Sequence, residues 1–452
     1  MEKLFKLKEN GTTVRTEAAA GLTTFLSVVY ILAVNPGMLA AAGMDAGAVF
    51  TATAISAALA TLCMAFFANY PVALASGMGL NAYFAYSVCV PMAEAGIEDP
   101  WTIALTAVLV EGIIFIILSL FKFRETLVNK VPMNLKLGIT VGIGLFITLV
   151  GLKSAGVVIG DASTLVALGD VATPQFALAM LGLIFIGILH HYNVPGFLLW
   201  GIIFTWGLGI VAQLIGWYHV DPAAGSPSLF PDFSGYHFLP DAPALFSFDF
   251  SYVANHVTEF AVIVFSFLFM DLFDTVGTLI GVAKKGNLLD ENGNLPRAGR
   301  ALMADAVGTV AGACLGTSTV TSYVESSAGV AQGGRTGLTA VFAAALFLLA
   351  LFFSPIFLAI PGFATTPALI FVGWLMMGSV KEMTFEGDIA DVTGGFMAIV
   401  MMPFTYSIAN GIMFGIITWV ILKVLTGKAR EIHPVMWVSF GVFALRIITL
   451  VI

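Results

Sequence analysis

Hydrophobic residues occur along this chain in long runs, which short polar segments separate. Eleven runs are long enough, at about 20 residues each, to cross a hydrocarbon core of ~30 Å as helices. They cover residues 15–36, 48–68, 101–121, 134–152, 175–190, 194–216, 256–283, 336–358, 365–383, 391–407 and 408–426. Three weaker candidates lie near 71–90, 301–315 and 316–332. The pattern predicts an all-α polytopic membrane protein with about fourteen transmembrane segments.

Two of the weaker candidates have a composition that a lipid-facing helix does not have. In 316–332, nine residues are Gly, Ser or Thr and one is the acid Glu325. In 71–90, a proline and two glycines, one of them Gly79, interrupt the segment just before Asn81. Polar, irregular backbone at membrane depth is tolerated only where protein buries it or where it lines a cavity. We therefore expect two broken helices, the third and tenth spans, that face one cavity.

Two weak internal repeats divide the chain into halves. The sequence that begins at Thr16 recurs at Thr258, and the motif that begins at Tyr192 recurs at Tyr406 with Gly, Ile and Ile at the same offsets. Halves of seven spans each must lie inverted in the bilayer, because seven is an odd number. Inverted repeats with broken helices at the midplane are typical of secondary transporters. The third span then pairs with the tenth, and the N-terminal ends of their half-helices point into one cavity.

Charged residues are scarce and unevenly distributed. Hydrophobic residues make up 59% of the chain and charged residues 10%, and the net charge of -8 argues against nucleic acid as a partner, because phosphate binding needs clustered cations. With the N-terminus inside and fourteen spans, seventeen of the nineteen Lys and Arg residues fall on one side: Lys3, Lys6, Lys8, Arg15, Lys122, Arg124, Lys130, Lys136, Lys284, Lys285, Arg297, Arg300, Arg335, Lys381, Lys423, Lys428 and Arg430. This positive-inside pattern predicts a multi-pass protein of the cell (inner) membrane with a cytoplasmic N-terminus.

The sequence favours neither metal nor enzyme chemistry. Cys63, Cys89 and Cys314 stand singly, without metal-ligand spacing, so we interpret them as packing residues and expect no metal or cofactor. An intramembrane aspartyl protease needs aspartates on two facing helices, whereas Asp271 and Asp274 share one turn. We therefore expect that the protein is not an enzyme.

Four acids lie inside predicted spans, where an ionisable group costs at least ~2.5–3.5 kcal/mol and marks a functional candidate. Asp271 and Asp274 share one helix face, Glu325 lies in the broken tenth span, and Glu111 lies near the middle of the fourth. No Lys or Arg is available at matching depth, so the charged form is disfavoured and one of these acids could take up and release a proton. Structural interpretations stay open. Asp271 and Asp274 could merely accept hydrogen bonds from nearby hydroxyls, and Glu111 could bond another helix as the neutral acid.

Residues beside the two breaks are the remaining candidates for substrate contact. Asn81 could cap a half-helix or touch the substrate. Among the aromatic residues, only Tyr83, Phe84 and Tyr323 lie close enough to the breaks to stack on a ligand.

Several long motifs stand out: MGLNAYFAY (78–86), FMDLFDTVGTLIG (269–281), LPRAGRALMADAVGT (295–309), GTSTVTSYVESSAGVAQGGRTGLTA (316–340) and MPFTYSIANGI (402–412). Together the chain resembles the adenine/guanine/hypoxanthine permeases, the AzgA-like branch of the nucleobase/cation symporters, over nearly its whole length. Urate/xanthine permeases carry a Gln-Asn pair in the tenth span, whereas ESSAG stands here at 325–329. This departure favours the purine-base branch.

The resemblance implies a uracil-permease-like fold of 7+7 inverted repeats, with short strands in broken spans 3 and 10. It further implies a core domain (1–121 and 256–360) and a gate domain (122–216 and 361–430). The polar, Pro- and aromatic-rich composition of 217–255 predicts an extracellular connection between the halves, and residues 431–452 are a C-terminal apolar segment. Whether this last segment crosses the membrane or lies at the interface stays open.

The resemblance also assigns roles. It implies that Asp271 and Glu325 hold the substrate, that Asn81 and Gly79 shape the pocket, and that Asp274 takes part in proton coupling. From their closeness to the breaks we add Tyr323 and Phe84 as substrate-binding candidates, and from the missing counter-charge we add Asp271 and Glu325 as proton-coupling candidates. We expect import of purine nucleobases by proton symport, with Na⁺ as the second choice of ion, and elevator-like movement of core against gate. The alternative is a SulP-like anion transporter of the same fold, which uncompensated acids in the cavity disfavour. The sequence leaves open which purine is preferred and whether the chain forms a homodimer.

Overall fold

The computed structural model describes residues 2–120, 131–161, 163–221, 227–233, 240–290 and 295–451. Ten helical segments in these ranges are long and apolar enough to cross a membrane. They are α2 with α3 (Val14–Val28, Ile31–Ala40), α4 with the π-helix η1 (Ala46–Cys63, Met64–Ala68), α7 (Pro100–Leu120), α9 (Met133–Ser154), α10 (Pro174–His191), α11 (Phe197–Leu214), α13 (Val257–Lys285), α16 through α17 (Gly337–Ala350, Ser354–Leu358), α18 (Gly362–Met377) and α20 (Ile408–Leu425). The predicted all-α membrane class is confirmed.

Four further segments bring the total to about fourteen, as predicted. Two are the helices α14 (Ala298–Leu315) and α19 (Ile389–Phe404), and two are the predicted broken spans. The third span runs through β1 (Leu74–Ser76), α5 (Met78–Ala82), the π-helix η2 (Tyr83–Cys89) and α6 (Val90–Glu94). The tenth runs through β4 (Val320–Ser322) and α15 (Ser326–Ala331). Outside these segments lie α1 (Glu2–Phe5), the hairpin of β2 (Val158–Asp161) and β3 (Leu165–Leu168), α12 (Phe250–Asn255) and α21 (Pro434–Val451). Three of the cations predicted to be cytoplasmic, Lys122, Arg124 and Lys130, lie outside the described residues.

The two broken spans meet through their strands. β1 and β4 form an antiparallel pair in which Ala75 is opposite Thr321, so backbone groups freed by the helix breaks bond each other. Glycine permits this close approach, because a Cβ on Gly77 would lie 2.6 Å from the Thr321 side chain. The strands are three residues each, and all six residues are buried.

The hydrogen bonds around the strand pair repeat with two-fold symmetry. Gly77 N–H donates to the Thr319 carbonyl, and its counterpart Tyr323 N–H donates to the Ala73 carbonyl. On the outer edge of each strand, a helix hydroxyl donates to a strand carbonyl. The Thr61 hydroxyl of α4 donates to the Leu74 carbonyl, and the Thr309 hydroxyl of α14 donates to the Val320 carbonyl. This local symmetry is what two inverted halves that meet at their broken spans should produce.

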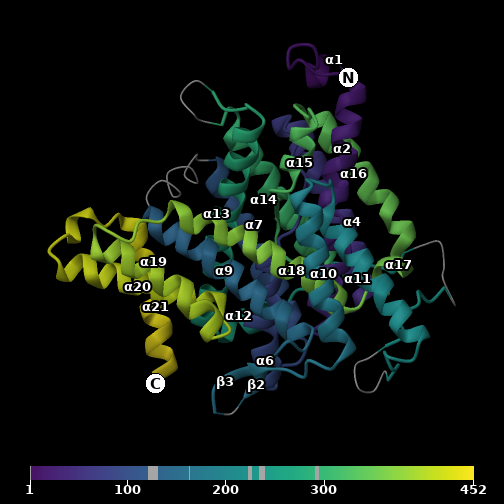
Figure 1. The fold of residues 1–452 in the computed structure, drawn as a ribbon. Helices are drawn as coiled ribbons and strands as arrows, with labels where there is room; N and C mark the ends of the chain where they lie inside the picture. The colour runs from purple at the N-terminus through teal and green to yellow at the C-terminus, as the bar shows by residue number, and fades with distance from the viewer. Residues whose placement is uncertain are drawn as a thin grey trace.

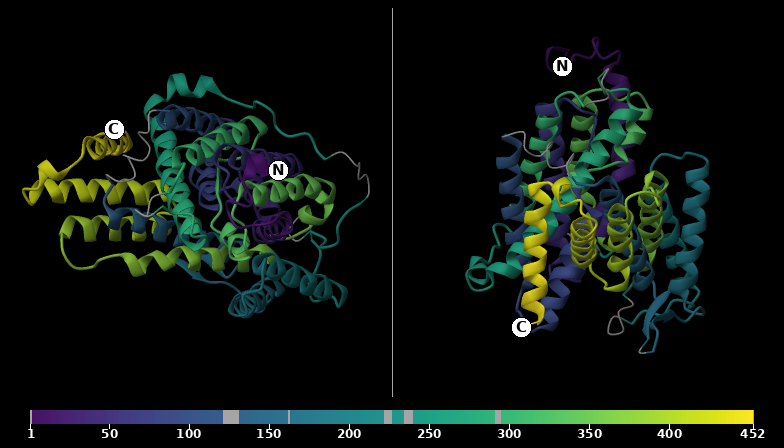
Figure 2. Two further views of the ribbon diagram at one scale, coloured as in Figure 1. Left: turned by 90° about the horizontal axis from the view of Figure 1, so that it is seen from above. Right: turned by 90° about the vertical axis from the view of Figure 1, so that its left-hand side faces the viewer.

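The long helices pack in two groups around this centre. One group contains α2, α4, α7, α13, α14 and α16, and it surrounds the strand pair. The other group contains α9, α10, α11, α18, α19 and α20. Figure 1 shows α19, α20 and α21 on the left of the molecule and α2, α4 and α16 on the upper right, and the left view of Figure 2 shows the same separation from above.

A buried acid joins the first and eleventh spans. Glu17, in the first turn of α2, is fully buried, and its carboxylate accepts hydrogen bonds from the backbone N–H groups of Arg335, Thr336 and Thr339. The hydroxyls of Thr336 and Thr339 also donate to it, at 2.9 and 2.7 Å. Thr336 is the N-cap of α16, so Glu17 neutralises orphan donors at that helix start.

Replacement of Glu17 by alanine should therefore destabilise the protein without changing its site. Loss of a buried acceptor that serves several donors costs about 2–4 kcal/mol. We expect a clear drop in the melting temperature of the detergent-solubilised protein, measured by thermal shift, for Glu17→Ala and a smaller one for Glu17→Gln. The exposed Glu9→Ala is the control, and equal melting temperatures for all variants would refute this role.

Candidate functional site

A cavity of about 570 Å³, counting the space that opens to solvent, lies beside the strand pair. One wall consists of the residue after β1 with the start of α5 (77–80) and of the end of β4 with the residues up to the N-cap of α15 (321–325). Helices α13, α18 and α9 and the bend between α2 and α3 form the rest. The lining residues are Tyr30, Gly77, Met78, Gly79, Leu80, Ile143, Met270, Asp274, Thr278, Thr321, Ser322, Tyr323, Val324, Glu325, Val372 and Met376. Both groups of helices thus contribute to the cavity.

Glu325 and a tyrosine from the first span form the polar end of the cavity. The Tyr30 hydroxyl donates to Glu325 Oε1 at 2.8 Å, and Tyr30 lies at the bend where α2 gives way to α3. The rings of Tyr30 and Tyr323 lie 6.5 Å apart, centroid to centroid. Tyr30 therefore orients the carboxylate while both rings give the cavity aromatic surface. Sequence reasoning missed Tyr30, because it stands in an uninterrupted apolar run that carries no sign of a bend.

The two aspartates of α13 point in different directions. Residues three apart on an α-helix are displaced by about 60° around its axis, so they can face different neighbours. Met270, Asp274 and Thr278 follow one another at intervals of four and line the cavity. Asp271 is fully buried on the adjacent face, where the Thr275 hydroxyl lies 3.0 Å from its Oδ1. Asp271, predicted to bind substrate directly, does not line the cavity in this structure.

Asp271 belongs to a buried cluster of two acids and two hydroxyls. Thr275 Oγ1 lies 3.0 Å from Asp271 Oδ1, 2.9 Å from Asp305 Oδ1 of α14 and 2.7 Å from the Thr321 hydroxyl. Thr275 has one hydroxyl hydrogen and can donate it to only one carboxylate. Even when Thr321 donates to Thr275, the one hydrogen of Thr275 is shared between two carboxylates unless one of them is protonated. The geometry is satisfied when one of the two aspartates carries a proton.

Asp305 is the second functional candidate that sequence reasoning missed. Its segment, 301–315, is only a weak span candidate, so the sequence analysis did not count Asp305 among the acids at membrane depth. The structure buries it completely and places it against Thr275. Since Thr321 both lines the cavity and contacts Thr275, the cluster lies directly behind the cavity wall.

Of the other predicted site residues, some line the cavity and the others lie behind its wall. Gly79 and Tyr323 line the cavity, and the Tyr323 hydroxyl donates to the Ser76 carbonyl at 2.5 Å. A Cβ on Gly79 would lie 2.8 Å from Ile143, so larger residues would narrow the cavity. Asn81 and Phe84 are fully buried and do not line it.

Asn81 and Phe84 sit behind the third span's break. Asn81 Oδ1 accepts a hydrogen bond from the Ser318 hydroxyl, which ties α5 to the segment before β4. Phe84 packs near Phe267 of α13, with ring centroids 6.5 Å apart. Glu111 accepts a hydrogen bond from the Thr319 hydroxyl at 2.8 Å. These contacts hold the two broken spans in position.

Comparisons with known proteins agree with this architecture. A model of a family described as "Permease family" (Xan_ur_permease) matches residues 15–414. The adenine permease AdeQ of Escherichia coli strain K12 is 43% identical over 448 residues, covering 99% of this chain and 96% of AdeQ. The guanine/hypoxanthine permease PbuO of Bacillus subtilis is 43% identical over 457 residues, covering 99% of this chain and 100% of PbuO.

A solved structure supports the fold independently of sequence. The transmembrane domain of the cyanobacterial bicarbonate transporter BicA superposes with a TM-score of 0.66 at 16% identity, over 88% of this chain and 97% of that domain. At this identity the likeness concerns the fold alone. From the family match and the full-length relatives, this chain belongs to the permease family and is a membrane transport protein rather than an enzyme.

Proposed function

We propose that this protein carries purine nucleobases (adenine, guanine or hypoxanthine) across the cell membrane into the cytoplasm, with its N-terminus on the cytoplasmic side. Full-length relatives at 43% identity carry the names adenine permease and guanine/hypoxanthine permease. The observation that carries the proposal most strongly is the cavity, which joins an oriented carboxylate to aromatic surface.

The chemistry of the cavity suits a flat, neutral heterocycle with donors along its edge. Glu325, held by Tyr30, offers carboxylate oxygens to ring N–H and amino groups, and guanine presents two such donors side by side. Tyr323 and Tyr30 offer ring surface on which a base can stack. Asp274 adds a second acceptor on the α13 side. A neutral substrate needs no cation in the cavity, and none of the lining residues is Lys or Arg.

An anion is a poorer candidate for this site. The fold neighbour BicA is a bicarbonate transporter, but fold likeness does not carry substrate. Two acids line the cavity, and both would repel an anion.

We propose that the coupling ion is a proton and that Asp271 and Asp305 share it through Thr275. Their geometry fits one protonated and one ionised carboxyl, and Thr321 connects them to the cavity wall. Asp274, in the cavity, is placed to sense whether a base is bound. Thr321 of the broken tenth span would thus lie between the proton site on α13 and α14 and the cavity, so that occupancy of one site can change the affinity of the other.

We further propose that the two groups of helices are a core and a gate that move against each other. The core comprises 1–121 and 256–360 and carries the strand pair; the gate comprises 122–216 and 361–430 and contributes Ile143, Val372 and Met376 to the cavity. These three gate residues are apolar, so the core can slide past them without breaking polar contacts.

Uptake assays test this function and its ion. Cells that lack their own purine permeases should gain saturable uptake of at least one of labelled adenine, guanine and hypoxanthine on expressing the protein. Collapse of the pH gradient should abolish accumulation, and collapse of the sodium gradient should leave it unchanged. Absence of saturable uptake of all three bases would refute the function, whereas the reverse gradient result would refute only the choice of ion.

A further inference from the structure

The C-terminal helix α21 lies beyond the segment that the family model matches. The match ends at residue 414, and α21 covers Pro434–Val451. With 18 residues the helix is about 27 Å long, close to the ~30 Å of a hydrocarbon core. It packs along both α20 and α13, one from each group of helices.

The composition of α21 fits a membrane crossing and not an interfacial helix. A helix that lies in the interface presents a strongly charged face to water. In α21 the only charged residue is Arg446, and Ser439 is buried with its hydroxyl on the Val435 carbonyl. Its outward-facing residues include Trp437, Val438 and Leu445, which are apolar and exposed as lipid contact would require.

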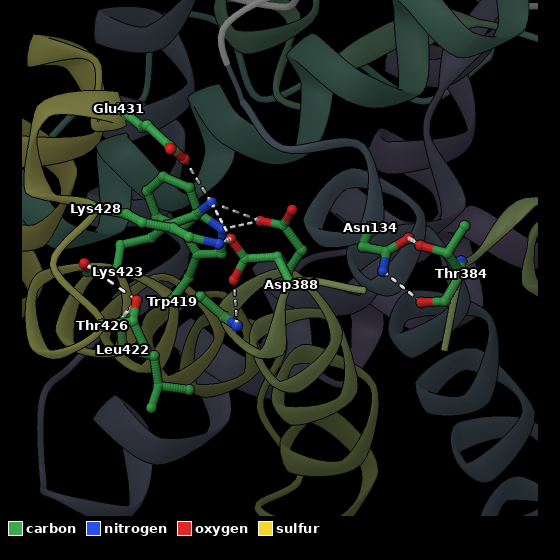
Figure 3. Close-up of polar contacts among 11 residues, drawn as sticks. Asn134, Thr384, Asp388, Trp419, Leu422, Lys423, Thr426, Lys428 and Glu431 are labelled. Carbon is green, nitrogen blue, oxygen red and sulfur yellow. Dashed lines mark hydrogen bonds and ion pairs between the residues drawn. The ribbon is translucent and has the colours of Figure 1, made fainter. Parts of the chain in front are cut away.

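The start of α21 is fixed to the gate by a cluster of charges (Figure 3). Lys423 of α20 donates to Asp388 at 2.7 Å and to Glu431, three residues before α21, at 3.1 Å. Lys428 also donates to Asp388, at 2.7 Å. Lys423 and Lys428 together hold the pKa of the Asp388 carboxyl far below its usual range. Because Lys423 is 7% exposed and has several partners, we expect this anchor to persist.

The far end of α21 is bound to the core instead. Arg446 Nη2 lies 3.5 Å from Glu259 Oε1, near the start of α13. The Tyr252 hydroxyl donates to the other oxygen of Glu259 at 2.7 Å. One turn deeper, the rings of Phe443 and Phe265 lie 5.4 Å apart.

These contacts also fix the direction of the helix. Residue numbers fall along α21 as they rise along α13, so the two helices are antiparallel. Figure 1 and the right view of Figure 2 place the N-terminus at one end of the molecule and the C-terminus at the other. The C-terminus lies at the same end as the β2–β3 hairpin.

We propose that α21 is a fifteenth membrane crossing that connects the gate to the core, a role we call the strap. We propose further that its contact with the core, between Arg446 and Glu259, breaks and re-forms in each transport cycle. The proposed movement of α21 rests on the core-and-gate function proposed above. Its membrane crossing does not depend on that function. The anchor at the start of α21 centres on the buried Lys423, which lies within 4 Å of three acids, Asp388, Asp391 and Glu431, whereas Arg446 and Glu259 are 28% and 33% exposed. Partly solvated pairs of this kind are weak enough to open during a conformational change.

The crossing is tested with reporters on the full chain. A fluorescent protein that folds only in the cytoplasm and a phosphatase active only outside are fused in turn to each terminus. We expect the two termini to report opposite sides of the membrane. Termini on the same side would overturn the crossing, and this readout does not depend on which molecule is transported.

The strap is tested by tethering α21 to the core. Glu259 and Arg446 are replaced by cysteine in a chain without Cys63, Cys89 and Cys314, and a short bis-methanethiosulfonate reagent links them. We expect the link to form, purine uptake to fall to background, and dithiothreitol to restore it. Each single-cysteine variant, treated alike, is the matched control and should keep its uptake.

Two results would overturn the strap. If no link forms, the two positions are not neighbours in the membrane. If linked protein transports at the rate of unlinked protein, α21 does not move relative to the core. Should the parent chain and the cysteine-free chain both show no purine uptake, the proposed function fails, while link formation and reporter topology still decide the placement of α21.

Discussion

Glu325→Gln should abolish purine uptake while the protein still reaches the membrane. Glutamine has almost the same shape, but it replaces one acceptor oxygen with a donor. It also removes the negative charge to which the Tyr30 hydroxyl donates and to which the bound base would donate. Loss of charge-assisted bonds to the base costs about 3 kcal/mol, which corresponds to about 100-fold in uptake efficiency. Initial rates with labelled guanine and hypoxanthine, normalised to the amount of protein in the membrane, measure this effect.

Glu94→Gln is the matched control, because it makes the same chemical change at an exposed residue that does not line the cavity. It should transport as the parent protein does. Near-normal uptake by Glu325→Gln at normal membrane abundance would remove this carboxylate from the site.

Asp305→Asn should uncouple transport from the proton gradient while the site continues to bind purine. Asparagine can satisfy Thr275, but its amide cannot take up and release a proton. A gradient of one pH unit supplies about 1.4 kcal/mol per proton and can concentrate a coupled substrate about tenfold. We expect the parent protein to accumulate purine in vesicles with an imposed pH gradient, and Asp305→Asn only to equilibrate it.

Exchange of labelled for unlabelled purine should survive in Asp305→Asn, because exchange needs no net proton movement. The exposed Asp170→Asn is the control and should keep both activities. If Asp305→Asn accumulates purine as the parent does, the proton is held elsewhere; if it loses exchange as well, Asp305 supports the binding site rather than coupling.

The hydrophobic pattern predicted the spans well, because lipid imposes a minimum length and forbids unpaired polar groups at membrane depth. The same rule identified the two broken spans, whose small polar residues now lie in paired strands between helices. The antiparallel meeting of β1 and β4 follows from inverted repeats, so it too could be expected from sequence.

The sequence could not predict which acids face the cavity. Spacing places Asp271 and Asp274 on one broad face. The packing of α14 brings Asp305 to Thr275, which also contacts Asp271, while Asp274 lines the cavity. Tyr30 was missed because its position depends on the bend between α2 and α3, which the residues at the bend do not predict. Asn81 and Phe84 lie near the break in sequence, yet the chain turns them into the packed interior. Side-chain direction near a break depends on tertiary contacts, and those are not local.

The central claim is that a neutral base sits between Glu325, Tyr323 and Gly79 beside the paired strands. An electron density map of the protein with guanine or hypoxanthine bound tests it most directly. We predict planar density in the cavity, with its edge within hydrogen-bond distance of Glu325. Density for the base elsewhere, or Glu325 turned towards lipid with the cavity empty under saturating purine, would contradict the account.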